Sequence, residues 1–212
     1  MESIRKSQFI LASASPRRRD LLRKAGYCFE IVSSDVDESA YDTNGMISEE
    51  HTQILALAKA KDVAAKFPNA LVVGSDTVVE LDGEIIGKPD DADHAEEITR
   101  KLFSKPHKVI TGLALVCIEK NIEIVEADTT IVYPRQLTEA QIAEHIRKGD
   151  WQDKAGAYGI QETGDAFVDR IDGSFTNVMG LPMELTRRLL EQLGIIPTKA
   201  RRREPPDCET VC

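Results

Sequence analysis

LVVGSDTVVELDGEIIGKPD, residues 71–90, is the stretch that decides the fold. It opens with an apolar run of the kind that a buried strand needs, and Asp76 follows where that run ends. A β-branched pair comes next, and Asp82-Gly83 is a strong signal for a two-residue hairpin turn. Lys88 lies just beyond, held between a glycine and a proline. We therefore predict a hairpin that fixes an acid and a base on neighbouring strands, which is more typical of a functional site than of a plain surface.

Strand and helix signals alternate on either side of this hairpin. Further strands are predicted at residues 8–12, 27–33, 107–118, 122–133 and 167–171. Helices are predicted at residues 17–26, 90–104, 138–149 and 182–194, and from residue 48 to just before Pro68. Because two of the strands are joined as a second hairpin around Lys120-Asn121, we expect a mixed rather than an all-parallel sheet.

The long helix that begins at Ser48 precedes the opening stretch. Its expected apolar stripe consists of Ile54, Leu55, Ala58, Val63 and Ala64. Lys59 and Lys61 fall in the middle of this helix, where most lysines are solvated. Their position alone therefore favours a surface role for both.

Length and composition indicate a globular α/β protein. The chain has 212 residues, is 42% hydrophobic and 30% charged, and contains no apolar run near the ~20 residues of a membrane helix. Its N-terminus lacks the apolar core of a signal peptide, and its four cysteines show no metal-binding spacing, so we expect a cytoplasmic protein. Residues 1–197 are predicted to form a single domain, and the charged residues 198–212 a disordered tail.

The net charge of −9 argues against non-specific nucleic-acid binding, but it leaves room for a small anionic ligand where basic residues gather. One such place is Ser13 to Arg18. Ser13 and Ser15 end a strand, and Arg17 and Arg18 enter the first turn of a helix, whose free N–H groups favour anions. A capped helix with a solvated basic face is the alternative, and local sequence leaves both open. Helix N-termini usually prefer acids, however, so a bound polyphosphate would explain the two arginines.

Acidic residues form a second candidate site, made of Asp35, Asp37, Glu38 and Asp76. Two carboxylates from separate elements are a usual way to hold Mg²⁺ while leaving coordination positions for water and phosphate. For residues 35–38 by themselves, an exposed acidic loop is the favoured interpretation. Asp76 is harder to dismiss, because an unpaired carboxylate near a buried strand is costly.

A glycine-rich loop at residues 153–164 carries Lys154, Tyr158 and Gln161, and such loops often carry function. We predict that Lys154 and Gln161 bind substrate, with Gln161 able to pair with a base edge. The four histidines are scattered, and the sequence has neither a GxGxxG nor a Walker lysine motif. Rossmann and P-loop chemistry are therefore not expected.

Seven segments in order together carry a family resemblance. They are LASASPRRRDLL (11–22), SDVDE (34–38), ALAKAKDVA (56–64), GSDTVVELDGEIIGKP (74–89), HKVITGLAL (107–115), DKAGAYGIQ (153–161) and FVDRIDGSFTNVMGLP (167–182). They resemble the Maf family of nucleoside triphosphate pyrophosphatases over nearly all of residues 8–194.

The resemblance implies an inosine-triphosphatase-like α/β fold, with an elongated mixed sheet flanked by helices and a cleft between two lobes. It implies hydrolysis of a nucleoside triphosphate to the monophosphate and pyrophosphate, assisted by Mg²⁺ or Mn²⁺, and commonly a homodimer. It assigns no role to the tail.

The resemblance also assigns roles to single residues. Asp76 would be the proton acceptor that activates water, and Glu38 would hold the metal with it. Lys59 and Lys88 would complete the catalytic set and bind the triphosphate. The other triphosphate-binding residues would be Ser13, Ser15 and Arg18.

Substrate choice in the family depends on three positions, and here they are Arg17, Thr77 and Gln161, which follow the pattern of members acting on dTTP and UTP. Two alternatives remain open. One is a non-catalytic nucleotide-binding regulator of cell division, and the other is a purine pyrophosphatase acting on inosine or 7-methyl-GTP nucleotides.

Overall fold

The computed structural model describes residues 7–41, 45–149, 151–152, 154–160 and 167–198. Its strands are β1 (Phe9–Leu11), β2 (Phe29–Ile31), β3 (Val72–Leu81), β4 (Glu84–Ile86), β5 (His107–Cys117), β6 (Ile122–Pro134) and β7 (Val168–Asp172). Its helices are α1 (Pro16–Lys24), α2 (Ser48–Lys66), α3 (Ala92–Leu102), α4 (Glu139–Lys148), α6 (Phe175–Val178) and α7 (Met183–Gln192), with short 3₁₀ turns η1 (Glu38–Ala40) and η2 (Ala155–Ala157).

The strands form one sheet in the order β2-β1-β3-β5-β6-β7, and β4 pairs with β3. β1 runs parallel to β2 and β3, whereas the other pairings are antiparallel. The predicted mixed sheet is therefore confirmed. The turn between β3 and β4 has positive φ at Asp82 (54°) and Gly83 (83°), as the predicted two-residue hairpin requires.

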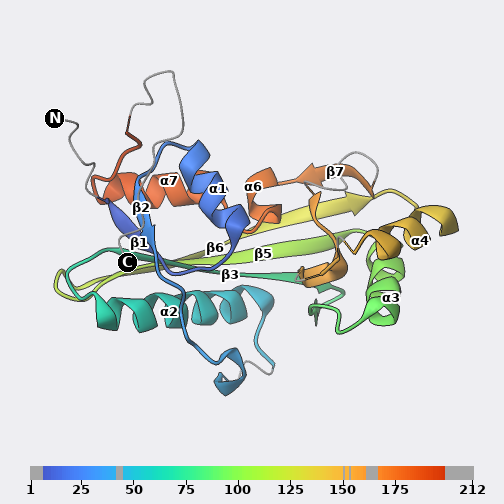
Figure 1. Cartoon of the computed structure of the whole chain (residues 1–212), viewed down its shortest axis with the longest axis horizontal. Helices are drawn as coiled ribbons and strands as arrows, with labels where there is room; N and C mark the ends of the chain where they lie inside the picture. The colour runs from blue at the N-terminus through green and yellow to red at the C-terminus, as the bar shows by residue number, and fades with distance from the viewer. Residues whose placement is uncertain (1–6, 42–44, 150, 153, 161–166, 199–212) are drawn as a thin grey trace.

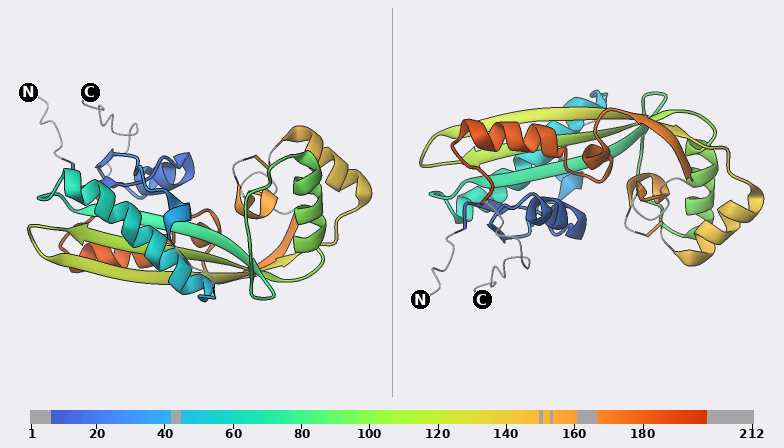
Figure 2. Two further views of the ribbon diagram at one scale, coloured as in Figure 1. Left: turned by 90° about the horizontal axis from the view of Figure 1, so that it is seen from below. Right: turned by 90° about the horizontal axis from the view of Figure 1, so that it is seen from above.

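Helices cover both faces of this sheet (Figure 1). α2 lies on one face, and α1, α6 and α7 lie on the other. β3, β5 and β6 are long enough to run on into a smaller lobe, where α3, α4 and η2 pack together (Figure 2). The α/β prediction, an elongated mixed sheet flanked by helices, is confirmed.

α2 packs unusually close to the sheet because glycines face it. A Cβ placed on Gly74 of β3 would lie 2.3 Å from the carbonyl oxygen of Ala56, and one on Gly112 of β5 would lie 2.2 Å from that of Thr52. Both distances are far below van der Waals contact, so only glycine leaves room for the helix backbone. This contact brings the middle of α2 against the part of β3 that carries Asp76.

The same close contact explains one wrong prediction about α2. Leu55, Ala58, Val63 and Ala64 of the predicted stripe are buried, but Ile54 is partly exposed on the outer side. The buried face instead includes the small residues Ser48, Thr52, Ala56 and Ala60. Because the sheet offers glycines there, α2 buries small side chains where a typical amphipathic helix would bury large ones.

The end of the described chain packs against the first lobe. The Thr198 N–H and hydroxyl both donate to the Gly26 carbonyl oxygen, at 3.0 and 2.8 Å. Residues 199–212, the rest of the predicted tail, lie outside the described residues.

Within the described ranges, no helix is long and apolar enough to cross a membrane. Cys28 and Cys117 are both buried.

Candidate active site

A cleft of about 1030 Å³ gathers residues from both lobes. It is lined by the start of α1, one face of α2, the middle of β3, the segment after β4, the η2 region and the loop after α6. The predicted site residues that line it are Ser13, Ser15, Arg17, Arg18, Glu38, Lys59, Asp76, Thr77, Lys88 and Lys154. Gln161 lies outside the described residues. Segments far apart in sequence thus converge on the hairpin at residues 71–90.

The two predicted metal-binding carboxylates meet at one lysine. Lys59 Nζ lies 2.6 Å from Asp76 Oδ1 and 2.7 Å from Glu38 Oε1. The Asp76 side chain is 9% exposed and that of Glu38 57% exposed, so one carboxylate is buried and the other faces solvent. Burying the Asp76 carboxylate is tolerable because the Lys59 ammonium pairs with it. Lys59 is therefore part of the site, although its position in a helix favoured a surface role.

Neighbouring acids of the 35–38 segment have other partners. Asp35 pairs with Lys66 at 2.9 Å. Asp37 caps η1 by accepting a hydrogen bond from the Ser39 N–H, and hydrogen bonds from Ser39 lower the pKa of Asp37. Among the described acids of this segment, Glu38 is thus the one placed against Asp76, since η1 begins with it.

The N-terminus of α1 opens into the cleft without an acidic residue in its first turn. Ser15 is the N-cap residue, yet its side chain makes no capping hydrogen bond, and Pro16 follows it. The Ser13 hydroxyl accepts from the Ser15 N–H at 3.3 Å. Uncapped N–H groups and the helix dipole make this end of the cleft suitable for an anion, as the sequence predicts.

Most N–H groups of the Arg18 guanidinium donate hydrogen bonds to other parts of the protein. Its Nε donates to the Gly180 carbonyl oxygen at 2.7 Å, and Nη2 donates to Thr77 Oγ1 at 3.0 Å. Nη1 donates to Ser13 Oγ at 3.2 Å and to the Ser75 carbonyl oxygen at 2.8 Å. Of the five N–H groups of a guanidinium, one on Nη2 is left for a ligand. Burial lowers the pKa of Arg18, and the Asp76 carboxylate opposes that shift.

The hydroxyl of Thr77 is part of the same network. Besides accepting from Arg18, Thr77 Oγ1 lies 3.0 Å from Thr111 Oγ1 and 3.4 Å from the Gly180 carbonyl oxygen. Gly180 belongs to the loop after α6, and buried Asn177 fastens that loop to the sheet by donating to the Val109 carbonyl oxygen at 3.0 Å. Thr77 and Arg18 together therefore hold one wall of the cleft in place.

Two other cations of the cleft are uncommitted. The side chains of Arg17 and Lys88 form no hydrogen bond or ion pair with any residue that the structure describes. Lys88 is exposed, and the carbonyl oxygen of the preceding Gly87 accepts from the Gly156 N–H at 3.2 Å. That bond ties the segment carrying Lys88 to η2. We call Arg18, Lys59, Asp76 and Thr77 the cleft floor, and Arg17 and Lys88 the cleft rim.

The wall contributed by the smaller lobe rests on a buried pair of rings. His107 Nδ1 lies 3.2 Å from the Leu102 carbonyl oxygen, and His107 Nε2 lies 2.7 Å from the Tyr158 hydroxyl. Since a carbonyl can only accept, Nδ1 carries the proton and Nε2 accepts from Tyr158. Burial lowers the pKa of His107 to about 4 and raises the pKa of Tyr158. Both rings are therefore neutral near pH 7.

Sequence reasoning missed several cleft residues. Gly180 lies within a segment that carries the family resemblance, but no role was predicted for it, and only its backbone carbonyl contributes. His51 also lines the cleft. Its spacing of four from Leu55 and eight from Lys59 places all three on one helical face, a signal that could have been used.

Comparison with known proteins identifies the family. The sequence model described as Maf-like protein matches residues 8–193. This chain belongs to the Maf family.

Curated relatives of this Maf-like chain are similar along nearly their whole length. A protein of Ruminiclostridium cellulolyticum named dTTP/UTP pyrophosphatase is 40% identical over 185 residues, which are 87% of this chain and 95% of that protein. One of Geotalea uraniireducens with the same name is 44% identical over 191 residues, which are 90% and 97% of the two chains. A solved structure, the Staphylococcus aureus Ham1 protein, matches at a TM-score of 0.43 with 14% identity, over 60% of this chain and 72% of that one.

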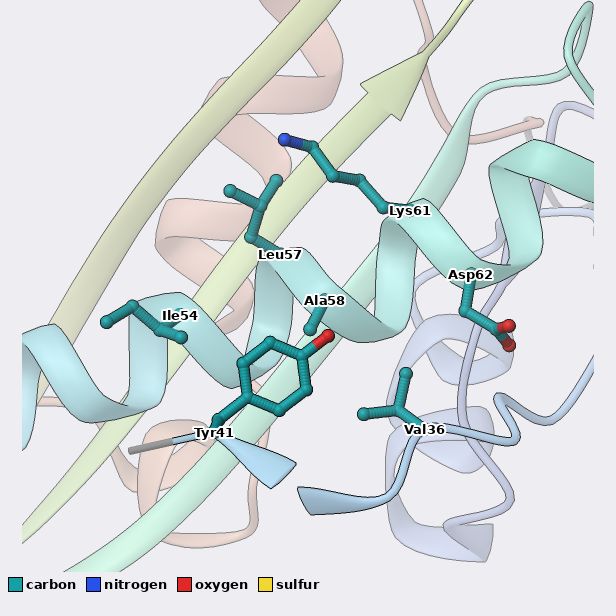
Figure 3. A pocket seen from close by; sticks show the side chains of 7 residues that line it. All are labelled: Val36, Tyr41, Ile54, Leu57, Ala58, Lys61 and Asp62. Carbon is teal, nitrogen blue, oxygen red and sulfur yellow. The ribbon is translucent and has the colours of Figure 1, made fainter. Parts of the chain in front are cut away.

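The Maf-like chain also has a second pocket, of about 510 Å³, against a different face of α2 (Figure 3). It is lined by Val36, Tyr41, Ile54, Leu57, Ala58, Lys61 and Asp62, and the Tyr41 ring lies over the helix. Lys61 pairs with Glu123 at 2.9 Å. Lys59 and Lys61, two residues apart, thus face different pockets because a helix turns by 100° per residue.

Proposed function

We propose that this chain is a pyrophosphatase that hydrolyses dTTP and UTP to the nucleoside monophosphate and pyrophosphate. The observation that carries the proposal is Lys59 of the cleft floor, which pairs with both Glu38 and buried Asp76 beside an uncapped helix N-terminus. Carboxylates next to an anion-binding helix end are what water attack on a phosphoanhydride needs. The relatives named dTTP/UTP pyrophosphatase, at 40 and 44% identity, support the choice of substrate.

Asp76 is the proposed proton acceptor. Its carboxylate lies at the base of the cleft on a strand whose backbone is paired with β5, so its position is well defined. From there it would orient a water molecule and take its proton as that water attacks the α-phosphorus in line with the departing pyrophosphate. Lys59 and Lys88 would offset the negative charge that develops on the transferred group and the leaving group.

A divalent cation, Mg²⁺ or Mn²⁺, fits the carboxylates of Glu38 and Asp76. The described residues contain no cluster of three potential metal-ligating side chains. Mg²⁺ is nevertheless commonly held by one or two carboxylates together with substrate phosphates and water. A bound cation would polarise the phosphate oxygens and neutralise their charge.

The resemblance to the family further supports a homodimer and a cytoplasmic location, which we include in the proposal.

The triphosphate is proposed to bind along the start of α1. Ser13 and Ser15 offer hydroxyl donors, and Arg17 offers an uncommitted guanidinium. Arg18 contributes its remaining N–H while it holds the floor together. Lys154, at the η2 side of the cleft, completes the set.

Preference for pyrimidines is proposed to depend on Arg17, Thr77 and Gln161. Thr77 would act indirectly, because its hydroxyl is engaged with Arg18 and lies near the Gly180 carbonyl oxygen. It would thereby set the position of the loop after α6 against the nucleotide. This role differs from direct reading of a base edge.

A nucleotide panel tests the proposal. The purified protein is incubated with Mg²⁺ or Mn²⁺ and with dTTP, UTP, the other canonical triphosphates, inosine triphosphate and 7-methyl-GTP, and kcat/KM is ranked for each. We expect dTTP and UTP to lead, with monophosphate and pyrophosphate as products. A purine at the head of the ranking would favour the purine pyrophosphatase, and no product at high protein concentration would favour the non-catalytic regulator.

Asp76→Asn tests the catalytic assignment, with Asp35→Asn as the matched control on the acidic segment. Loss of a general base typically costs 10²–10⁴-fold, so kcat for dTTP should fall by at least about 100-fold. Binding of dTTP, measured by calorimetry, should change little. Asp35 pairs with Lys66 outside the cleft lining, so its variant should keep its turnover. Near-normal turnover of Asp76→Asn would refute the assignment.

A further inference from the structure

The ammonium of Lys59 stands between the two carboxylates proposed to hold the divalent cation. It is within 2.7 Å of an oxygen of each, while its side chain is only 15% exposed. A lysine ammonium offers three donors and no acceptor, so this position is compatible with carboxylates and incompatible with another cation. The carboxylates of Glu38 and Asp76 therefore already have a cationic partner in the absence of metal.

We propose that Lys59 is a built-in competitor of the divalent cation, and that its ammonium must leave the Glu38–Asp76 pair before metal binds there. The inference rests on the metal site of the proposed function. Mg²⁺ takes oxygen ligands at about 2.1 Å, so it would lie against the same carboxylate oxygens that Lys59 now contacts. Two cations that close together in a partly buried site would repel each other strongly.

Release of Lys59 would change the charge of the cleft floor. With Lys59 between them, Glu38 and Asp76 leave the trio with one net negative charge. A dication in its place, with Lys59 still tethered nearby, gives the same group one net positive charge. Because Arg18 adds one positive charge to the floor, the net charge of the whole group would change from zero to plus two, and its attraction for a triphosphate would increase. Metal binding would therefore strengthen the electrostatic attraction for the nucleotide, and the freed ammonium would be available to the phosphates.

The packing of α2 limits this change to the side chain of Lys59. Ala56 and Ala60, which flank it on the helix, lie against Gly74 so closely that the backbone cannot approach β3 further. Both alanines are fully buried. The lysine stem, in contrast, has four rotatable bonds and reaches into an open cleft. A rotamer change is thus enough to move the ammonium.

Mn²⁺ binding in the absence of nucleotide tests the proposal, with free Mn²⁺ followed by electron paramagnetic resonance at pH 8. Lys59→Met should bind Mn²⁺ at least about tenfold more tightly than the wild type, because the competing cation is gone. Lys59→Arg keeps a cation and should stay within about threefold of the wild type. Lys61→Met, two residues along the same helix and paired with Glu123, is the matched control and should not change.

The double variant Lys59→Met/Asp76→Asn locates the effect, because it should lose the tightened Mn²⁺ binding. Unchanged or weaker Mn²⁺ binding by folded Lys59→Met would overturn the proposal. This readout contains no nucleotide, so it can succeed even when the dTTP and UTP assay fails, and the reverse also holds.

A second measurement uses the wild-type protein and so does not depend on the variant folding. Acetic anhydride labelling followed by mass spectrometry compares Lys59 with Lys61 in the presence and absence of Mg²⁺. We expect Mg²⁺ to raise the labelling of Lys59 several-fold and to leave that of Lys61 unchanged. Equal labelling of Lys59 in both conditions would contradict its release.

Discussion

At the cleft floor, Arg18 and Lys59 donate to protein acceptors from several segments, whereas at the rim Arg17 and Lys88 donate from their side chains to no residue that the structure describes. All four line the same cleft. Arg17 and Arg18 are even adjacent on α1, so the difference comes from where each side chain points. Side chains of the same charge thus have two roles: those of the floor hold the protein together, and those of the rim are available to a ligand.

The contrast assigns different costs to losing each cation. A floor cation satisfies buried acceptors, and removing it leaves those acceptors unpaired, which costs about 1–3 kcal/mol for each. A rim cation faces solvent in the free protein, so its loss should leave the fold intact and act only on the binding and reaction of the substrate. Stability and substrate affinity should therefore separate between the two regions.

The largest expected effect comes from Arg18→Met compared with Arg17→Met. Arg18→Met leaves the Ser75 carbonyl oxygen without its donor and the Gly180 carbonyl oxygen with only two long hydroxyl contacts of 3.4 Å, and it should lower the free energy of unfolding by about 4 kcal/mol. Arg17→Met should change it by no more than about 0.5 kcal/mol. Urea unfolding followed by circular dichroism measures both. Equal losses in the two variants would break the distinction between floor and rim.

Acid should lower the stability of the cleft wall contributed by the smaller lobe, which rests on the neutral side chains of His107 and Tyr158. The pKa of His107 in the fold, about 4, lies below the unfolded value near 6.5. His107 is neutral in both states above pH 6.5, where stability is highest, and stability falls as the unfolded state alone binds a proton between pH 6.5 and 4. At 1.36 kcal/mol per unit, the loss is about 3 kcal/mol.

Unfolding curves at pH 7 and pH 4.5 test this prediction. His107→Gln does not titrate and keeps a donor and an acceptor, so its stability should fall less over this interval than that of the wild type. His94→Gln, an exposed histidine near Asp90, is the control and should keep the wild-type slope. A slope unchanged in His107→Gln would refute the assignment.

A methyl group on Gly74 should push α2 away from β3 and so alter the contact between Lys59 and Asp76 in the cleft floor. Gly74→Ala would place its Cβ 2.3 Å from the Ala56 carbonyl oxygen, so α2 must move away from β3. Overpacking of this kind typically costs 1–3 kcal/mol, and we expect about 2 kcal/mol of lost stability with a clear loss of dTTP turnover. Thermal unfolding compares it with Gly87→Ala, whose Cβ meets nothing within 4 Å. Equal unfolding temperatures for the two variants would contradict the packing argument.

The smallest effect is expected for Lys88→Met at the rim. The kcat/KM for dTTP should fall about tenfold, equivalent to about 1.4 kcal/mol, while the free energy of unfolding stays within about 0.5 kcal/mol of the wild type. Steady-state kinetics at two salt concentrations provide the measurement, because screening should reduce the difference between variant and wild type. A loss of stability as large as that of Arg18→Met would place Lys88 in the floor.

Local rules made much of the fold predictable. Asp82-Gly83 forms the expected turn because both residues tolerate positive φ. The helix predicted at residues 138–149 begins with a capping box formed by Thr138 and Gln141 at the start of α4. The family resemblance also named nine residues that line the cleft, although their roles there stay predictions. These predictions succeeded because each depends on a short segment or on the order of segments along the chain.

The differences between neighbouring residues were not predictable in this way. The sequence by itself does not show that Arg18, and not Arg17, donates to the Gly180 carbonyl oxygen. Nor does it show that Glu38, and not Asp37, forms the ion pair with Lys59. A step of one residue changes a side chain's direction by about 100° in a helix. Which direction is buried depends on the sheet beneath it.

The hairpin at residues 71–90, the alternation of strands and helices, and the acids and bases available for chemistry follow from the sequence by itself. Tertiary structure decided which of those charges would be paired. The glycines of β3 and β5 let α2 lie close enough for Lys59 to reach Asp76, and the loop after α6 came near enough for Arg18 to hold it. The physical reason is that a charge becomes committed only where burial removes water and a partner from a distant segment replaces it.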